Sequence, residues 1–509
     1  MKTIGFRKKT KFQKTKKMLS YTFSNISISY ILLLTVAFSF FSGINNFSKT
    51  VDASASGFEM INESLEDLAL YSWPINTQLS QAFLSLKSSI ENYSDGKNVF
   101  ETNEADIKLL INFLEDNYET VMGFDYLEDY TRFLEFLGKS LNYKDDIYQI
   151  LGKDQKQKYI IALQNSNEAR PNGGFFGSFI LLEIKNGKID YTIKDSYKVD
   201  AQDSIEKVDS PQRRQDNIAD SRISFVSSNV LGFTDKDGEN IIDIYESAFP
   251  EKSINGVIFL QSQLLEKMLP GFREKMRQWQ FVNAAGRIMN KDNDDFQEKQ
   301  VYMEQLNNYI QSNKYLLFQN FAKNFELVQD EGYVQAYFPD ASDEFKNFLQ
   351  ENLLYTTFQE DIGYFWDFNY SYNKIDGFVE KYIKIKKDGE ILKTTNFDRV
   401  DFDDFESGVY NIVIGYNLNV PSRYKTYIKE LEKQYDVEMA EREKHILNFG
   451  YDFENMGLVY LPKELDILEV KTNPKAYRKF NTPYSTNIVY VLSGNENNKL
   501  HKIEFMIEL

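Results

Sequence analysis

The chain has no cysteine, and its 509 residues include only two histidines, His445 and His501. The absence of cysteine excludes disulfides, thiolate metal sites, iron–sulfur clusters and cysteine nucleophiles. The two histidines lie far along the chain without supporting motifs. Their placement argues against a serine–histidine–acid triad, a multi-histidine zinc site and a histidine metalloprotease helix. Any metal is therefore expected to be a hard cation held by oxygen ligands.

Outside the N-terminus, acidic residues outnumber lysines and arginines. The net charge is -17, but the first 17 residues hold eight lysines or arginines and no acid, which leaves -25 on the remaining 492 residues. Non-specific affinity for nucleic acid comes mainly from lysines and arginines that neutralise phosphates. An acidic body of this size is expected to repel nucleic acid, so a nucleic-acid function is not expected.

Long uncharged runs are also scarce, because only one has the length of a membrane span. No charged residue occurs from Met18 to Ser48, and the apolar centre reads ISISYILLLTVAFSFFSGI. A helix of that centre rises about 28 Å, close to the hydrocarbon thickness of about 30 Å. The segment 21–48 is therefore predicted to be a transmembrane signal anchor that follows a basic cytoplasmic tail, 1–20. The positive-inside rule places the bulk of this single-pass protein outside the cytoplasm.

A cleaved signal peptide is the alternative interpretation of this segment. The residues Ala53-Ser54-Ala55 resemble a small-residue cleavage site. The apolar stretch is longer than the usual signal-peptide core of about 7 to 15 residues, which favours an uncleaved anchor. A buried core helix fits poorly because of the basic flank.

The rest of the chain predicts an α+β multidomain protein. Over 58–150, apolar residues recur at three- and four-residue steps, which predicts a helical bundle. Short apolar runs then alternate with helical spacing over 155–375, which indicates a mixed α/β domain. Period-two alternation and regular turns over 376–509 predict a C-terminal β-sandwich, with a helical insertion at 423–446.

One stretch, QNSNEARPNGGFFGS at 164–178, is unlike the rest of the chain and allows three interpretations. Pro171-Asn172-Gly173-Gly174 suits a tight turn, since proline presets one dihedral and glycine accepts positive φ. The glycines also allow backbone N–H groups to approach an anion, with Arg170 as a donor fork. In the third interpretation, Glu168 and Arg170 form an internal ion pair. The glycine spacing matches neither the dinucleotide fingerprint nor the P-loop.

The same stretch resembles the signature of the bacterial domain of unknown function 4012 family, whose members are uncharacterised membrane-anchored proteins. The matching positions are Gln164, Asn165, Glu168, Arg170, Pro171, Gly173, Gly174, Phe175, Gly177 and Ser178. The resemblance continues in INGVIFLQSQLLEKMLPGF, and in NYSYNKIDGFV through Asn369, Asn373, Lys374 and Asp376. A segment of the family with an Asp-Ala-Asn-type motif is altered here, because Arg222 replaces its asparagine and the second acid is missing. The resemblance implies an extracytoplasmic protein associated with the cell envelope, without an assigned reaction.

The layout is also distantly similar to the LytR-CpsA-Psr enzymes, which move lipid-linked glycopolymers onto peptidoglycan. That similarity implies arginines that hold pyrophosphate and aspartates that hold magnesium. The candidate anion-binding residues are Arg170, Arg213, Arg214 and Arg222, and the candidate metal ligands are Asp195, Asp200, Asp216 and Asp220. Two further functions therefore stay open: a phosphotransferase with a magnesium cofactor, and a non-enzymatic adhesion or scaffold protein that binds envelope glycopolymer or peptidoglycan. Convergence of these residues with Arg170 on a pocket favours the enzyme, and burial of Arg170 against Glu168 favours the scaffold.

Overall fold

A five-stranded sheet forms the centre of the α/β part. The computed structural model describes residues 131–185, 188–206, 208–209, 222–276, 278, 305–306, 308–310, 312–359, 362–369, 379–395, 399–403, 405–418, 429–430, 432–433, 453–463, 465–471, 476–481, 485–494 and 501–509. The strands are β1 (Gln157–Arg170), β2 (Gly173–Lys185), β3 (Lys188–Asp195), β6 (Gly256–Gln261) and β7 (Val334–Tyr337), in the order β3-β2-β1-β6-β7. β1 and β6 are parallel, and the other neighbours are antiparallel. Central β1 reads as a nearly continuous apolar run, KYIIALQ, as expected for a strand covered on both faces.

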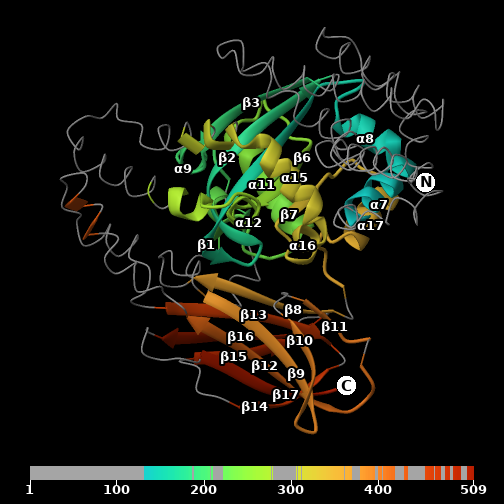
Figure 1. The fold of residues 1–509 in the computed structure, drawn as a ribbon, viewed down its shortest axis with the longest axis vertical. Coiled ribbons are helices and arrows are strands. Elements are labelled where there is room, and N and C mark those ends of the chain that lie inside the picture. The colour runs from blue at the N-terminus through green and yellow to red at the C-terminus, as the bar shows by residue number, and fades with distance from the viewer. Residues whose placement is uncertain are drawn as a thin grey trace, which may run out of the picture.

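Helices cover both faces of this sheet (Figure 1). The helices are α7 (Thr131–Ser140), η3 (Leu141–Tyr143), α8 (Lys144–Ile150), α9 (Tyr197–Asp200), η4 (Phe225–Ser227), α11 (Thr234–Ala248), α12 (Ser262–Met268), α15 (Lys314–Lys323), α16 (Phe325–Asp330) and α17 (Asp343–Glu351). Val257 and Phe259 of β6 join the core cluster of α11, whereas Leu260 packs with α12 and α16. Successive strand residues point to opposite faces, so α11 lies on one face and α12 with α16 on the other. A short ribbon, β4 (Val208–Asp209) with β5 (Arg222–Ile223), lies beside them.

Two antiparallel five-stranded sheets form the C-terminal part. One has the order β10-β9-β12-β17-β14 and the other β11-β8-β13-β16-β15. Their strands are β8 (Ile362–Asn369), β9 (Val379–Lys387), β10 (Glu390–Thr395), β11 (Arg399–Asp401), β12 (Val409–Leu418), β13 (Phe453–Pro462), β14 (Asp466–Lys471), β15 (Ala476–Asn481), β16 (Ser485–Gly494) and β17 (His501–Glu508). Side chains from both sheets, among them Ile414, Val459 and Ile488, share one hydrophobic core. β9 and β10 form a hairpin about Asp388-Gly389, with φ of 52° and 88° at these residues.

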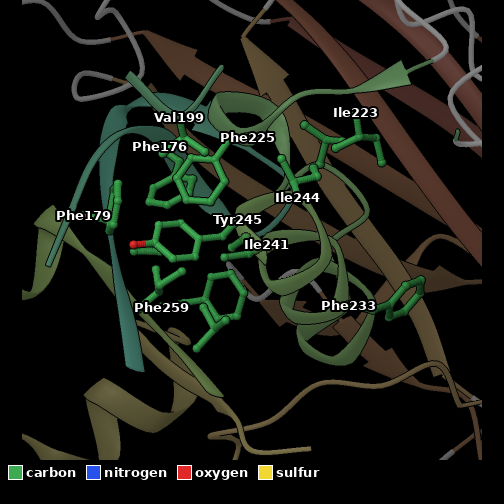
Figure 2. Packing of buried hydrophobic residues seen from close by; sticks show 14 of the residues in the cluster. Phe176, Phe179, Val199, Ile223, Phe225, Phe233, Ile241, Ile244, Tyr245 and Phe259 are labelled. Atoms are coloured by element: carbon green, nitrogen blue, oxygen red, sulfur yellow. The ribbon is translucent and has the colours of Figure 1, made fainter. Parts of the chain in front are cut away.

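The two C-terminal sheets together are called the two-sheet unit. This unit shares a second hydrophobic core with the α/β part. Tyr364 and Trp366 of β8 and Leu458 of β13 belong to the same buried cluster as Phe176 and Ile244. Figure 2 shows this cluster, in which Phe233 lies apart from the other labelled rings and beside the strands of the two-sheet unit. The ring of Phe233 meets the ring of Trp366 edge-on, with centroids 4.6 Å apart. The two parts are therefore joined by a packed apolar interface.

The predicted mixture of helices and several sheets is confirmed. No helix among the described residues is long and apolar enough to cross a membrane. The predicted tail, 1–20, and anchor, 21–48, lie outside the described residues, as does the predicted bundle over 58–150 except for α7, η3 and α8. Of the predicted insertion, 423–446, only residues 429–430 and 432–433 are described, and they are helical. The domain limits at 155, 375 and 376 stay predictions.

Candidate functional site

Among the described residues, many of the buried polar side chains lie where β1 and β6 end. The two strands are parallel and pair as far as Gln164 with Gln261, so their carboxyl ends meet at one edge of the sheet. Beyond this pair, the backbone N–H of Ser166 donates to Ser262 Oγ at 3.1 Å. Ligands of open α/β sheets bind outside the carboxyl ends of the strands. The edge that holds the stretch 164–178 is therefore the candidate functional site.

The stretch itself is a bulged hairpin. β1 and β2 pair through Asn165 with Phe175 and again through Ala169 with Gly174, so the three residues between Asn165 and Ala169 bulge out of the ladder. Pro171 and Asn172 form the two-residue turn, and Gly173 has a φ of 94°. That backbone angle favours glycine. The tight turn predicted from the sequence is confirmed.

A network of side-chain amides fixes the tip of this hairpin inside the protein. Asn229 Nδ2 donates to the carbonyl oxygens of Asn172 at 3.2 Å and Gly174 at 2.7 Å. Gln164 Nε2 donates to the same Asn172 oxygen. A Cβ on Gly174 would lie 2.4 Å from the carbonyl carbon and oxygen of Asn165. Gly174 is therefore required because the two backbones approach each other too closely for any side chain.

A fully buried carboxyl supports the loop behind the tip. Asp237, in the first turn of α11, accepts hydrogen bonds from the N–H groups of Leu231 and Gly232, both at 2.9 Å. Burial raises the pKa of Asp237 to about 8, although these N–H groups and the nearby Asn172 amide act in the lowering direction. The Asn172 Nδ2 atom makes no hydrogen bond of normal geometry within the described part of the chain. Asp237 thus links the loop at 231–232 to the helix behind the hairpin tip.

Arg170 and Glu168 form a buried ion pair. Arg170 donates from Nη2 to Glu168 Oε1 at 2.7 Å and from Nη1 to the carbonyl oxygen of Ala169 at 2.8 Å. The two residues are only 7% and 9% exposed. The Arg170 guanidinium also lies over the ring of Phe175, with 5.4 Å from Cζ to the ring centroid. This is the internal ion pair of the third interpretation.

Tyr197 lies near this pair and contacts the same phenylalanine ring. Its ring centroid lies 6.2 Å from that of Phe175, and 52% of Tyr197 is exposed. Partial burial raises the pKa of the Tyr197 hydroxyl, the Glu168 carboxylate adds to the increase, and Arg170 acts against it. The charged pair therefore has one partly exposed aromatic side chain near it.

The two described candidate metal ligands, Asp195 and Asp200, accept hydrogen bonds from backbone N–H groups. The Asp195 carboxylate accepts the N–H of Tyr197 at 3.0 Å. The Asp200 carboxylate accepts the N–H groups of Phe225 at 2.7 Å and Val226 at 3.1 Å, at the start of η4. In the regions that the structure describes, no group of three or more histidine, cysteine, aspartate or glutamate side chains could hold a metal ion.

The other candidates cannot be placed together with Arg170. Arg213, Arg214, Asp216, Asp220, Asn373, Lys374 and Asp376 lie outside the described residues. For Arg222 in β5 and Asn369 in β8, the structure describes the backbone position but not the side chain. Two residues that the sequence did not single out, Asn229 and Asp237, make the central polar contacts. Neither residue belongs to a motif that the sequence showed, so no local signal could have found them.

Residues 154–274 match the model of a family described as protein of unknown function (DUF4012). The matched region contains the 164–178 stretch and the strand–helix unit at 254–272, so the resemblance expected from these residues is confirmed. No curated protein matches the chain. No solved structure matches it either, and the distant similarity to LytR-CpsA-Psr enzymes has no support in these comparisons.

Proposed function

We propose that this chain, which carries a DUF4012 domain over residues 154–274, is a membrane-anchored extracytoplasmic protein of the bacterial cell envelope that acts as a non-enzymatic scaffold or adhesion module. The apolar segment 21–48 supplies a single-pass anchor, with the N-terminus in the cytoplasm. The partner is envelope glycopolymer or peptidoglycan, engaged by the two-sheet unit. Nucleic acid is not a partner because the body of the protein is acidic.

The environment of Arg170 is the observation that supports a scaffold over a phosphotransferase. An arginine that binds pyrophosphate must direct its donors at the phosphate oxygens. Here the guanidinium donates to Glu168 and Ala169 and is only 7% exposed. Removing one partner of a buried ion pair costs about 3–5 kcal/mol. A new hydrogen bond to a charged group returns about 1.5–3 kcal/mol, so exchanging Glu168 for phosphate gives no clear gain.

The two described candidate aspartates support the same proposal. The Asp200 carboxylate accepts two backbone N–H groups, and the Asp195 carboxylate accepts one. A magnesium ion requires near-octahedral oxygen ligands and would compete with those hydrogen bonds. These contacts give both residues a structural role in positioning η4 and the start of α9.

The enzyme and the scaffold differ in their response to a lipid pyrophosphate. We expect the full chain in lipid nanodiscs to show no change in melting temperature, and no group transfer, with polyprenyl pyrophosphate analogues of several chain lengths and magnesium. An analogue-dependent and magnesium-dependent rise in melting temperature that disappears in Arg170→Lys would establish the phosphotransferase instead. The lysine variant keeps the positive charge but lacks the planar donor fork.

Binding to the envelope polymer tests the scaffold directly. The full chain in detergent should sediment with purified peptidoglycan sacculi, and the Arg170→Lys variant should sediment equally well. A chain that stays in the supernatant at every salt concentration tested would contradict the proposed partner. Protease added to intact cells tests the orientation, because it should digest the body of the protein and leave the basic tail protected.

A further inference from the structure

A lysine and an aspartate meet between the two sheets of the two-sheet unit. Lys381 lies on β9 and Asp367 on β8, and these strands belong to different sheets. Residues two positions apart on a strand share a face, and Ile383 and Phe365, each two positions from one of the charged residues, belong to the core. Both charged side chains therefore occupy core-facing positions. Lys381 Nζ lies 3.0 Å from Asp367 Oδ2, and only 11% and 18% of the two side chains are exposed.

Tyrosine hydroxyls hold the aspartate in position. Tyr416, the register partner of Lys381 on β12, donates its hydroxyl proton to Asp367 Oδ1 at 2.6 Å. The Tyr416 hydroxyl also lies 2.7 Å from the hydroxyl of Tyr490, and both tyrosines are only 1% exposed. Gly457 makes room for this contact, because a side chain there would occupy the space of the Tyr490 ring. Burial, and then the nearby carboxylate, raise the pKa of the Tyr416 hydroxyl well above its usual value, so this group keeps its proton.

The interior of the two-sheet unit favours a neutral form of this pair. Taking an ammonium and a carboxylate out of water has a free-energy cost that can exceed their mutual attraction. Transfer of one proton from Lys381 to Asp367 removes both charges, and burial shifts the pKa values of lysine and aspartate side chains toward that neutral form. A neutral amine is a nucleophile and a carboxylic acid has an electrophilic carbon. Groups held in contact react much faster than free ones, because their relative motion is already restricted.

We propose that Lys381 and Asp367 condense to an isopeptide bond that links the two sheets covalently. The bond between Nζ and Cγ forms, and the bond between Cγ and Oδ2 breaks. Two of the three ammonium protons leave with Oδ2 as one water molecule, and the third stays on the amide nitrogen. The step therefore needs no oxidant, reductant or further reactant. The Tyr416 hydroxyl stabilises the negative charge that develops on Oδ1 while the new bond forms.

The hydrogen-bond partners of the product are already in place. A secondary amide has one N–H donor and one carbonyl acceptor. Lys381 Nζ donates to the carbonyl oxygen of Phe365, and Asp367 Oδ1 accepts the proton of Tyr416. The condensation thus replaces a buried ion pair with a neutral amide whose two polar groups keep their partners. The inference does not depend on the proposed scaffold function.

Peptide mapping of the full chain, purified in detergent, denatured and digested with trypsin, tests the bond. Trypsin cannot cleave after a lysine whose side chain forms an amide. The digest should contain a branched peptide that joins residues 347–374, which include Asp367, to residues 375–384 through Lys381. Its mass should be lower by one water molecule than that of the two separate peptides, and fragmentation should place the branch at these two residues.

Two results would overturn the bond. The first is a digest of the unaltered chain with cleavage after Lys381 and only the separate peptides. The second is a loss of water that leaves the cleavage after Lys381 intact, which indicates a cyclic imide at Asp376-Gly377 in place of the link. Both results come from the unaltered chain, so they are decisive even if a variant fails to fold.

Three variants assign the residues. Lys381→Arg should lack the branched peptide, and Lys384→Arg on the same strand is the matched control that should retain it. Loss of one hydrogen-bond donor of this kind slows a reaction about 10²–10³-fold, so freshly purified Tyr416→Phe should contain less branched peptide, and the linked fraction should rise during incubation. A branched peptide in Lys381→Arg would overturn the assignment to Lys381. Equal linked fractions in Tyr416→Phe and the unaltered chain would overturn the role of Tyr416.

Discussion

Replacement of Asp237 by asparagine is expected to flatten the dependence of stability on pH. Burial raises the pKa of this carboxyl from 3.8 to about 8 in the folded protein. In the unfolded chain the group loses its proton near pH 4, so between pH 4 and pH 8 the folded state binds more protons than the unfolded state. The unfolding free energy therefore falls as pH rises through this window, by at most about 1.4 kcal/mol per pH unit. The stabilisation is complete below pH 4 and is lost above pH 8.

Asparagine cannot ionise, so the variant should lack this contribution. It keeps one oxygen acceptor for the two N–H groups of Leu231 and Gly232, and one unpaired N–H costs about 1–3 kcal/mol. Asp237→Asn should therefore be less stable than the unaltered chain at pH 5, and the difference should shrink or reverse toward pH 8. The melting-temperature difference should change by at most about 1–2 °C per pH unit.

The measurement is a series of melting curves of the full chain in detergent from pH 5 to pH 9. Hydrogen exchange at the Leu231 and Gly232 amides gives a local readout of the same hydrogen bonds. Glu239→Gln on the surface of α11 is the control, because its side chain is 45% exposed. If the difference between the unaltered chain and Asp237→Asn stays constant across this range, the carboxyl does not titrate there and the reasoning fails.

Three further substitutions test the packing described above. Gly232→Ala should cost about 2–4 kcal/mol of unfolding free energy, because it combines a φ of 84° with a Cβ 2.5 Å from the Trp366 ring. Gly271→Ala is the control, because Gly271 has a φ of 78° but nothing lies within 4 Å of an added Cβ. Equal losses of melting temperature in the two variants would refute the clash. Arg170→Met should lower the free energy of unfolding by about 3–5 kcal/mol, and the double variant Glu168→Gln/Arg170→Met should lower it by less. Additive losses in the double-mutant cycle would show that the two side chains are not coupled. Gly174→Ala should lower the melting temperature and speed hydrogen exchange in β1 and β2, and unchanged exchange would contradict the close approach to Asn165.

Local structure could be predicted well from the sequence. The apolar run KYIIALQN became β1, NGVIFL became β6, and the Asp388-Gly389 turn joined β9 to β10. These features depend on neighbouring residues, because side-chain alternation and turn dihedrals are properties of a short segment. The turn at Pro171 and Asn172 was predictable for the same reason.

Contacts between distant segments could not be predicted. β1 lies beside β6 although Lys158 and Asn255 are 97 residues apart, and no local pattern encodes that pairing. The Asn229 amide donates to the carbonyl oxygen of Asn172 at the hairpin tip, although the two residues are 57 positions apart in the sequence. The candidate site includes the 164–178 stretch that the sequence singled out, but the partners of Arg170 and the role of Asp237 required the fold.

The shared core between the α/β part and the two-sheet unit limits how this protein can be divided. β8, which ends at Asn369, lies between β11 and β13 in one of the two sheets. A fragment that starts at 376 would lack this strand and would leave Leu458 and Tyr460 uncovered by the cluster that buries them. The two parts are therefore expected to be expressed, inherited and exchanged as a single unit, and not as independent modules.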